Sequence, residues 1–124
     1  MSKHFWRNDL IQPALDHDVK AAIADQHAIL ADDPTDASAH FALGTLTHFT
    51  GDTEKAIQHF EQAIQLDPTY GEAHASLGRI YAVRGDYELA WKHARAAEQG
   101  GDRSVVELLE RYPCTPGPGK NQPG

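Results

Sequence analysis

Eight histidines give this 124-residue chain its most versatile side chains. Imidazole nitrogens bind transition metals, and the ring changes its charge between pH 5 and 8. Two histidine pairs are regularly spaced, because the interval from His40 to His74 is the same as the interval from His59 to His93. Each pair therefore occupies equivalent positions of a repeated unit.

A metal site is not the interpretation that this spacing favours. Two imidazoles that share one zinc place their nitrogens at about 2.0–2.1 Å from it, whereas equivalent residues on adjacent helices lie about 8–10 Å apart. No His-x-x-x-His motif accompanies either pair. We therefore predict no metal and no cofactor, and interpret the histidines as packing and surface residues. Because protonation of all eight would change the formal charge from -7 to +1, we hypothesise that partner affinity depends on pH.

The remaining polar residues do not form a recognisable catalytic motif. The sequence has no glycine-rich phosphate loop, no serine or cysteine with a placed base, and no carboxylate cluster beyond helix caps and charged helix faces. We predict no catalytic residue and no enzymatic activity. The charge of -7 also argues against nucleic-acid binding, which requires a basic surface.

An internal repeat organises the chain, since residues 37–70 recur with variations as residues 71–104. A period of this length is typical of stacked helical hairpins. The matching positions are Ala39 and Ala73, His40 and His74, Leu43-Gly44 and Leu77-Gly78, Gly51-Asp52 and Gly85-Asp86, Ala56 and Ala90, and Ala63 and Ala97.

Each copy is predicted to contain two helices with defined ends. Gly51 and Gly85 favour the left-handed backbone that ends a first helix, and the aspartates after them cap the second. Pro68 ends the second helix of the first copy. Gly44 and Gly78 permit close approach of a neighbouring helix. The predicted buried stripe of the second helix is Ala56, Ile57, Phe60, Ala63 and Ile64, with counterparts Ala90, Trp91, Ala94, Ala97 and Glu98.

The starts of three helices are predicted from capping residues. The first helix of the first copy begins near Thr35 or Asp36. Thr69 with Glu72, and Ser104 with Glu107, have the spacing of a capping box, in which a hydroxyl and a carboxylate bond to the free amides of a helix start.

These positions resemble the tetratricopeptide repeat family, in particular a small bacterial-type domain. The first copy supplies His40, Leu43, Gly44, Thr47, Ala56, Phe60, Ala63 and Pro68, and the second His74, Leu77, Gly78, Tyr81, Ala90, Ala94 and Ala97. The departures are histidine at both tryptophan positions, Thr47 for tyrosine, Ala94 for an aromatic residue and Asp102 for the closing proline. The resemblance implies an all-α fold, a right-handed superhelical stack of antiparallel helix pairs with a C-terminal capping helix.

The resemblance also implies a non-catalytic module that binds a peptide or protein segment in a concave groove. The groove positions that it implies are Ser38, Phe41, Thr45, His48, Phe49, Glu72, Ala75, Arg79, Ala82 and Val83. Arg79 is the one cation among them, so recognition of a peptide carboxylate by a cluster of basic residues is not expected. A peptide that inserts an apolar side chain fits better. Alternatively, Phe41 and Phe49 are ordinary packing residues.

The N-terminal part is predicted to be a degenerate first repeat. Residues 1–16 form an arm or a degenerate first helix, with Pro13 in the first turn of a new helix, and residues 17–36 form the second helix of that repeat. Leu15, Val19, Ile23 and Leu30 give the segment an apolar face. Phe5 and Trp6 are expected to fold back onto it, or alternatively to reach a partner subunit.

The C-terminal part is predicted to hold a capping helix at residues 104–113 and a disordered tail at residues 114–124. The single cysteine permits no internal disulfide. We expect one cytoplasmic domain that is not bound to a membrane, is monomeric or weakly self-associating, and has a protein or peptide partner. The alternative function is a self-associating scaffold that uses its N-terminal arm or the ends of the solenoid.

Overall fold

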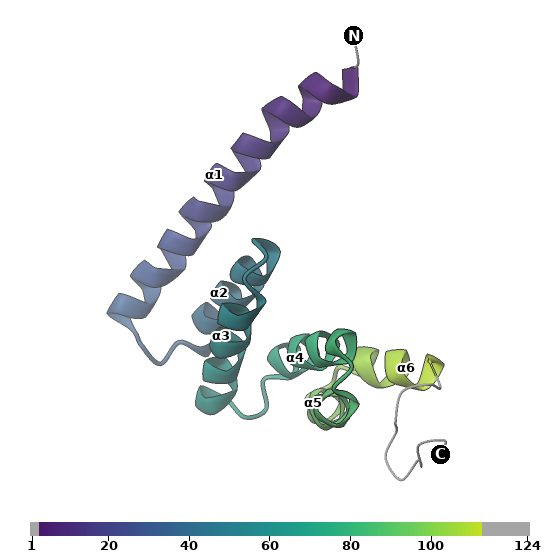
Figure 1. The fold of residues 1–124 in the computed structure, drawn as a ribbon. Helices are drawn as coiled ribbons and strands as arrows, with labels where there is room; N and C mark the ends of the chain where they lie inside the picture. Colours follow the sequence, from purple (N-terminus) through teal and green to yellow (C-terminus); the bar gives the residue numbers. More distant parts are fainter. Residues whose placement is uncertain (1–2, 113–124) are drawn as a thin grey trace. The chain divides into compact units, whose positions relative to one another are not determined.

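The computed structural model describes the backbone of residues 3–112 and the side chains of residues 17–112. The described residues form only α-helices: α1 (Lys3–Asp32), α2 (Ala37–Phe49), α3 (Thr53–Leu66), α4 (Gly71–Arg84), α5 (Tyr87–Gln99) and α6 (Ser104–Arg111) (Figure 1). Neighbouring helices pack in pairs, α1 on α2 and α4 on α5. The predicted all-α fold of packed helix pairs is confirmed. The chain divides into two compact units, Met1–His59 and Phe60–Gly124, with the boundary inside α3.

Aspartate side chains cap three helices as predicted. Oδ1 of Asp36 accepts a hydrogen bond from the amide of Ala39 at 3.1 Å, and Asp52 and Asp86 do the same for the amides three residues after them. Each bond satisfies an amide that a helix start leaves without a partner. At the end of α4, Gly85 has a φ of 84°, the left-handed conformation that its position predicted.

The two predicted capping boxes are wrong. The hydroxyl of Thr69 donates to Oδ1 of Asp67 at 2.7 Å, and the N-cap residue of α4 is Tyr70, which makes no side-chain capping bond. Ser104 likewise bonds to the carboxylate of Asp102 instead of capping α6. A carboxylate two residues earlier in the chain therefore engages each hydroxyl in a turn, and the hydroxyl is not available to the helix.

The same turn occurs at three places in the part of the chain that the structure describes. Asp33 bonds to Thr35, Asp67 to Thr69 and Asp102 to Ser104, in each case through the amide of the later residue. The first two turns are one repeat period apart, and the third comes a single position later than the period places it, because Gly100-Gly101 adds one residue. In the structure Asp102 therefore corresponds to Asp67 of the preceding turn. The sequence register had instead aligned Asp102 with the closing proline, Pro68.

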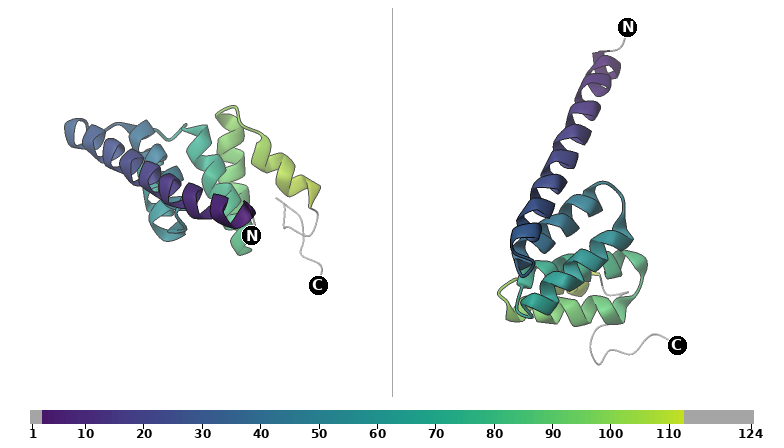
Figure 2. Two further views of the ribbon diagram at one scale, coloured as in Figure 1. Left: turned by 90° about the horizontal axis from the view of Figure 1, so that it is seen from above. Right: turned by 90° about the vertical axis from the view of Figure 1, so that its left-hand side faces the viewer.

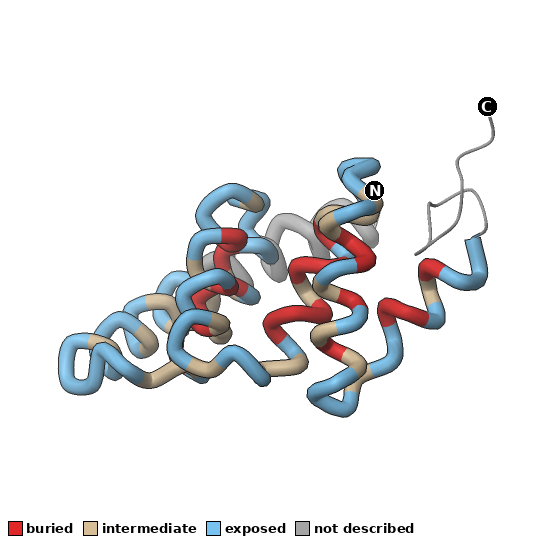
Figure 3. The backbone as a smooth tube through the Cα atoms, turned by 90° about the horizontal axis from the view of Figure 1, so that it is seen from below, coloured by how far each residue is buried: buried red, intermediate tan, exposed pale blue. Residues whose placement is uncertain are grey.

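The second unit has a core that α4, α5 and α6 share. Its buried cluster consists of Ala75, Ala90, Trp91, Ala94, Ala97, Val105, Val106 and Leu109, and Figure 3 shows the buried positions recurring along these helices. Gly78 brings α6 close, because a Cβ there would lie 3.0 Å from Cγ1 of Val105 and 3.4 Å from the carbonyl oxygen of Ala90. The close approach predicted at Gly78 is confirmed.

In the first unit, α1 covers α2 with one face. The half-buried positions of α1 are three, four or seven residues apart, as expected of a helix with one packed side. They are Val19, Ala22, Ile23, Gln26 and Leu30, so the apolar face that was predicted is confirmed where side chains are described. On α2, Leu43 is fully buried, and the hydroxyl of Thr47 donates to its carbonyl oxygen at 2.8 Å.

The predicted break near Pro13 does not occur, since α1 is one continuous helix of 30 residues (Figure 2). Proline inside a helix costs roughly 3 kcal/mol, but Leu10, Gln12, Ala14 and Leu15 around it all favour helix. The predicted fold-back of Phe5 and Trp6 onto residues 17–36 is also wrong. In a continuous helix Phe5 and Ile23 are separated by about 27 Å along the axis. The proposed disordered tail falls on residues outside the described range.

Candidate functional site

The predicted groove positions of the first copy lie on α2. Ser38, Thr45, His48 and Phe49 are exposed, and Phe41 is half-buried. The hydroxyl of Ser38 is engaged, because it donates to Oδ1 of Asp36 at 2.6 Å beside the helix cap. Phe49 is 67% exposed, which is unusual for a phenylalanine. On this helix, Phe49 is therefore the residue most available for an apolar contact.

The predicted positions of the second copy lie on α4 and differ in exposure. Glu72, Arg79 and Val83 are exposed, and Ala82 is half-buried. Ala75 is only 1% exposed because it belongs to the core cluster beneath α5 and α6. The expectation that Ala75 faces a partner is therefore wrong for this folded state: the close packing that Gly78 permits brings the terminal helix over it.

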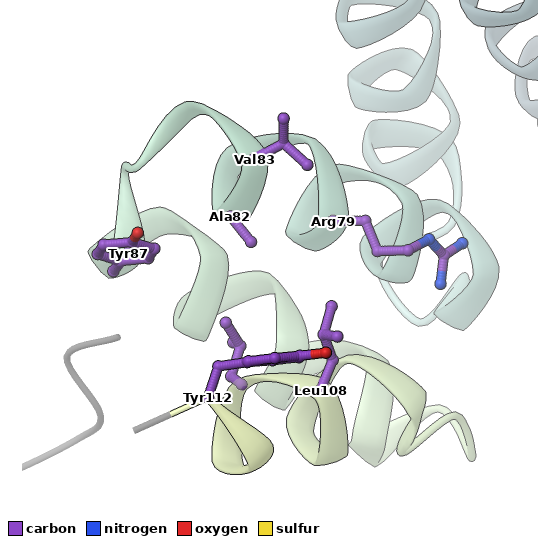
Figure 4. Close-up of a pocket in the computed structure, with 7 residues that line it drawn as sticks. Arg79, Ala82, Val83, Tyr87, Leu108 and Tyr112 are labelled. Carbon is purple, nitrogen blue, oxygen red and sulfur yellow. The ribbon is translucent and has the colours of Figure 1, made fainter. Parts of the chain in front are cut away.

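Three of the α4 residues line a pocket of about 330 Å³ in the second unit. Its walls come from α4, α5, α6 and the residue after α6: Arg79, Ala82, Val83, Tyr87, Leu108, Leu109 and Tyr112. Figure 4 shows Val83 and Arg79 on α4 above Tyr112 and Leu108, with Tyr87 at one side. Most of this lining is apolar or aromatic, and Arg79 carries its one formal charge. Such a pocket suits an apolar side chain with a polar group beside it.

Arg79 has a free guanidinium within the part of the chain that the structure describes. It forms no ion pair there, although its charge contributes to the lowered pKa of Asp102. The larger causes of that lowered pKa are the hydrogen bonds from the hydroxyl and the amide of Ser104. Five N–H donors of Arg79 are thus available to carbonyl or carboxylate oxygens of a ligand.

Four lining residues were not predicted as site residues. Tyr87 follows the cap of α5, while Leu108, Leu109 and Tyr112 come from α6 and its end. Leu108 and Leu109 lie within the capping helix predicted at residues 104–113, which was not expected to line a binding site. The sequence feature that could have indicated this wall is Tyr112, an aromatic residue at the end of a short amphipathic helix. In the structure Tyr112 is 54% exposed.

A second polar feature joins α4 to α5 through two histidines. Nδ1 of His74 lies 3.1 Å from Nδ1 of His93, and Nε2 of His74 lies 2.9 Å from the carbonyl oxygen of Pro68. Because a carbonyl oxygen accepts, Nε2 of His74 carries a proton, and its Nδ1 is the acceptor for the N–H of His93. The two partners belong to the two helices of one hairpin, not to equivalent positions of successive copies.

Burial lowers the pKa of His93 to about 4, with further lowering by the charges of His74 and Lys92. The ring of Tyr81 stacks on that of His93, with centroids 5.7 Å apart and planes 14° apart. In the described part of the chain, no group of three or more His, Cys, Asp or Glu side chains is arranged to hold a metal ion. The pair forms a hydrogen-bonded contact between α4 and α5.

Comparison with known families identifies the repeat. Residues 50–85 match the family described as TPR repeat, a range that runs from the end of α2 through α3 and α4. This stretch of the chain is therefore similar to a tetratricopeptide repeat, which confirms the resemblance to that family predicted from its residues. No match to a curated protein was found. Among the helices of the described residues, none has both the length and the apolar character required to cross a bilayer.

Proposed function

We propose that this protein is a non-catalytic adaptor that binds a segment of another protein through the exposed surface of its first helices. Tetratricopeptide repeats are protein-interaction modules, which supports the class of function. The observation that carries the finer proposal is the pocket of about 330 Å³ beside Arg79. It offers an apolar side chain a place to be buried, which is how a few anchor residues dominate many interfaces.

The proposed ligand is a peptide segment with a large apolar side chain, neutral or basic overall. Val83 is 88% exposed at the pocket edge, and its equivalent in the first copy, Phe49, is also exposed. Arg79 donates to a carbonyl or carboxylate oxygen of the segment next to its apolar anchor. The formal charge of -7 disfavours a strongly acidic partner. A cytoplasmic location is part of the proposal.

A selection from a random peptide library tests this proposal, with the purified chain as bait. We expect the selected peptides to share a large apolar residue. We further expect Val83→Glu to weaken their binding at least tenfold, about 1.4 kcal/mol, because it places a charge at the apolar edge. Gln65→Glu is the matched control: it adds the same charge at an exposed position away from the pocket lining.

Two outcomes would overturn the proposal. Equal affinity of Val83→Glu and Gln65→Glu for the selected peptides would move the binding surface away from the pocket. If no peptide is selected and the molecular mass rises with protein concentration, the exposed apolar residues instead support self-association, which is the scaffold alternative.

A further inference from the structure

We propose that His74 and His93 form a proton-sensitive latch, which holds α4 against α5 at neutral pH and releases the two helices in acid. The proposal begins from their contact across the hairpin, with 3.1 Å between the two Nδ1 atoms and 5.3 Å between the ring centroids. The latch does not depend on the identity of any binding partner, since its effect is the opening of the hairpin itself.

The number of protons on the four ring nitrogens determines the state of the latch. The neutral pair carries two, one on Nε2 of His74 toward Pro68 and one on Nδ1 of His93 toward His74. A third proton can be taken up while one of the two Nδ1 atoms stays unprotonated and accepts, so both hydrogen bonds remain. A fourth proton leaves an N–H on both Nδ1 atoms, so that two N–H groups face each other at 3.1 Å and the hydrogen bond is replaced by repulsion.

The surroundings of the pair do not compensate for two positive charges. The α4 groups beside His93 are His74 and the phenol ring of Tyr81, and the nearby charge on α5 is Lys92, which is also positive. At the junction with α6, Arg103 pairs with Glu98 at 3.1 Å and lies 3.8 Å from Glu107. Within the described residues, no carboxylate contributes to the pKa of His93.

The direction of the pH effect follows from the lowered pKa of His93. In the unfolded chain His93 takes up a proton near the ordinary histidine pKa of about 6.5, whereas in the folded chain it does so only near a pKa of about 4. The unfolded state therefore binds more protons between these values, and stability that is fully present above about pH 6.5 is lost as the pH falls toward 4. Opening of α4 from α5 also removes two walls of the pocket beside Arg79.

Urea unfolding of the full chain at pH 7.5 and pH 5.0 tests the latch. Both values lie above the ordinary pKa values of aspartate and glutamate, about 3.9 and about 4.3, so the carboxylates contribute little. We expect the unfolding equilibrium constant of the natural chain to rise about tenfold at pH 5.0, allowing for solvent screening at a half-buried ring. His93→Phe, which keeps a ring for Tyr81, should show less than about a twofold rise. His27→Gln is the control because His27 is exposed on α1, and it should behave as the natural chain.

An NMR titration of the natural chain tests the latch without a variant. We expect the ring of His93 to titrate near pH 4 and its Nδ1 proton to be protected at neutral pH. Titration close to pH 6.5 would overturn the proposal, as would an unchanged pH dependence in His93→Phe. If His93→Phe does not fold, the titration midpoint and the protection of the Nδ1 proton decide the question.

Discussion

The ring centroids of His40 and His59 in the first copy of the repeat are 6.3 Å apart, whereas those of His74 and His93 in the second are 5.3 Å apart. The shorter separation accompanies a direct contact between nitrogens. In the first copy, Nδ1 of His40 is buried and has no hydrogen-bond partner among the described residues. Identical residues at equivalent positions thus have different hydrogen-bonding environments.

One further position explains part of this difference. Tyr81 of the second copy lays its ring on His93, while its equivalent, Thr47, directs its hydroxyl to carbonyl oxygens of its own helix at 2.8 and 3.2 Å. An aromatic ring shields a neighbouring imidazole from water and a threonine does not, so desolvation depends on this residue. The comparison teaches that a repeat can keep its packing residues and still vary the chemistry between them.

The largest expected effect tests whether the two copies are equally well packed. Leu43 and Leu77 occupy equivalent positions and are both 0% exposed. Replacement of either by alanine should lower the free energy of unfolding by about 3 kcal/mol, through lost burial and the cavity left behind. Chemical denaturation of the two variants measures it. A loss below about 1 kcal/mol at one position would show that its copy collapses around the cavity.

The next largest effect is expected from a substitution that removes the difference between the two histidine pairs. Tyr81→Thr introduces the residue of the first copy, and we expect a loss of about 2 kcal/mol because an aromatic ring is removed from the interior. The pKa of His93, about 4 in the natural chain, should rise toward its ordinary value as water reaches the ring. NMR titration measures it, with Tyr112→Thr as the control at an exposed tyrosine. An unmoved midpoint would mean that Tyr81 does not shield His93.

A smaller effect concerns the approach of α6 to α4. Gly78→Ala places a methyl group 3.0 Å from Cγ1 of Val105, and we expect a loss of about 1 kcal/mol after the better helix propensity of alanine is counted. In the Val105→Ala background, the same change should be neutral or stabilising. Denaturation of the two single variants and the double variant completes the cycle. Additive losses would contradict a direct contact.

The smallest expected effect is the change in stability at acid pH that follows from protonation of Asp36 and Asp102. Asp36 accepts from Ser38 and from the Ala39 amide, and Asp102 from the hydroxyl and amide of Ser104, so the pKa of each lies below its usual 3.8. Their stabilisation is present above about pH 3.8 and is lost as the pH falls through their lowered pKa values. We expect Asp36→Asn and Asp102→Asn each to change the pH dependence of the unfolding equilibrium constant below pH 4 by less than about twofold. Larger changes would imply additional charged partners.

The sequence was sufficient to predict the helices of the repeat, because local signals and long-range period agree there. Asp36, Asp52 and Asp86 cap helices where predicted, and Leu43 and Leu77 are buried in equivalent places. Whether α1 continues through Pro13 was not predictable from the proline alone. The free-energy cost of a proline inside a helix has to be weighed against the helix propensity of its neighbours. The capping boxes failed because an aspartate two residues earlier competes for the hydroxyl.

The candidate site was predictable only in part. Arg79, Ala82 and Val83 were predicted and line the pocket, but its other walls depend on how α6 packs after the last repeat. The same packing buries Ala75, which no periodic pattern on α4 alone reveals. The contact between His74 and His93 was not predicted, because the sequence repeat relates residues that are one period apart. The hairpin instead brings together residues of its own two helices.

The turn at Asp102 has a consequence for the growth of the array. It is built like those at Asp33 and Asp67, and the helix that follows it starts where the first helix of another repeat would start. In this respect α6 is a shortened first helix, with 8 residues against 14 in α4. A designer could therefore lengthen α6 and append a second helix without inventing a new joint, because the connector already exists at that point in the chain.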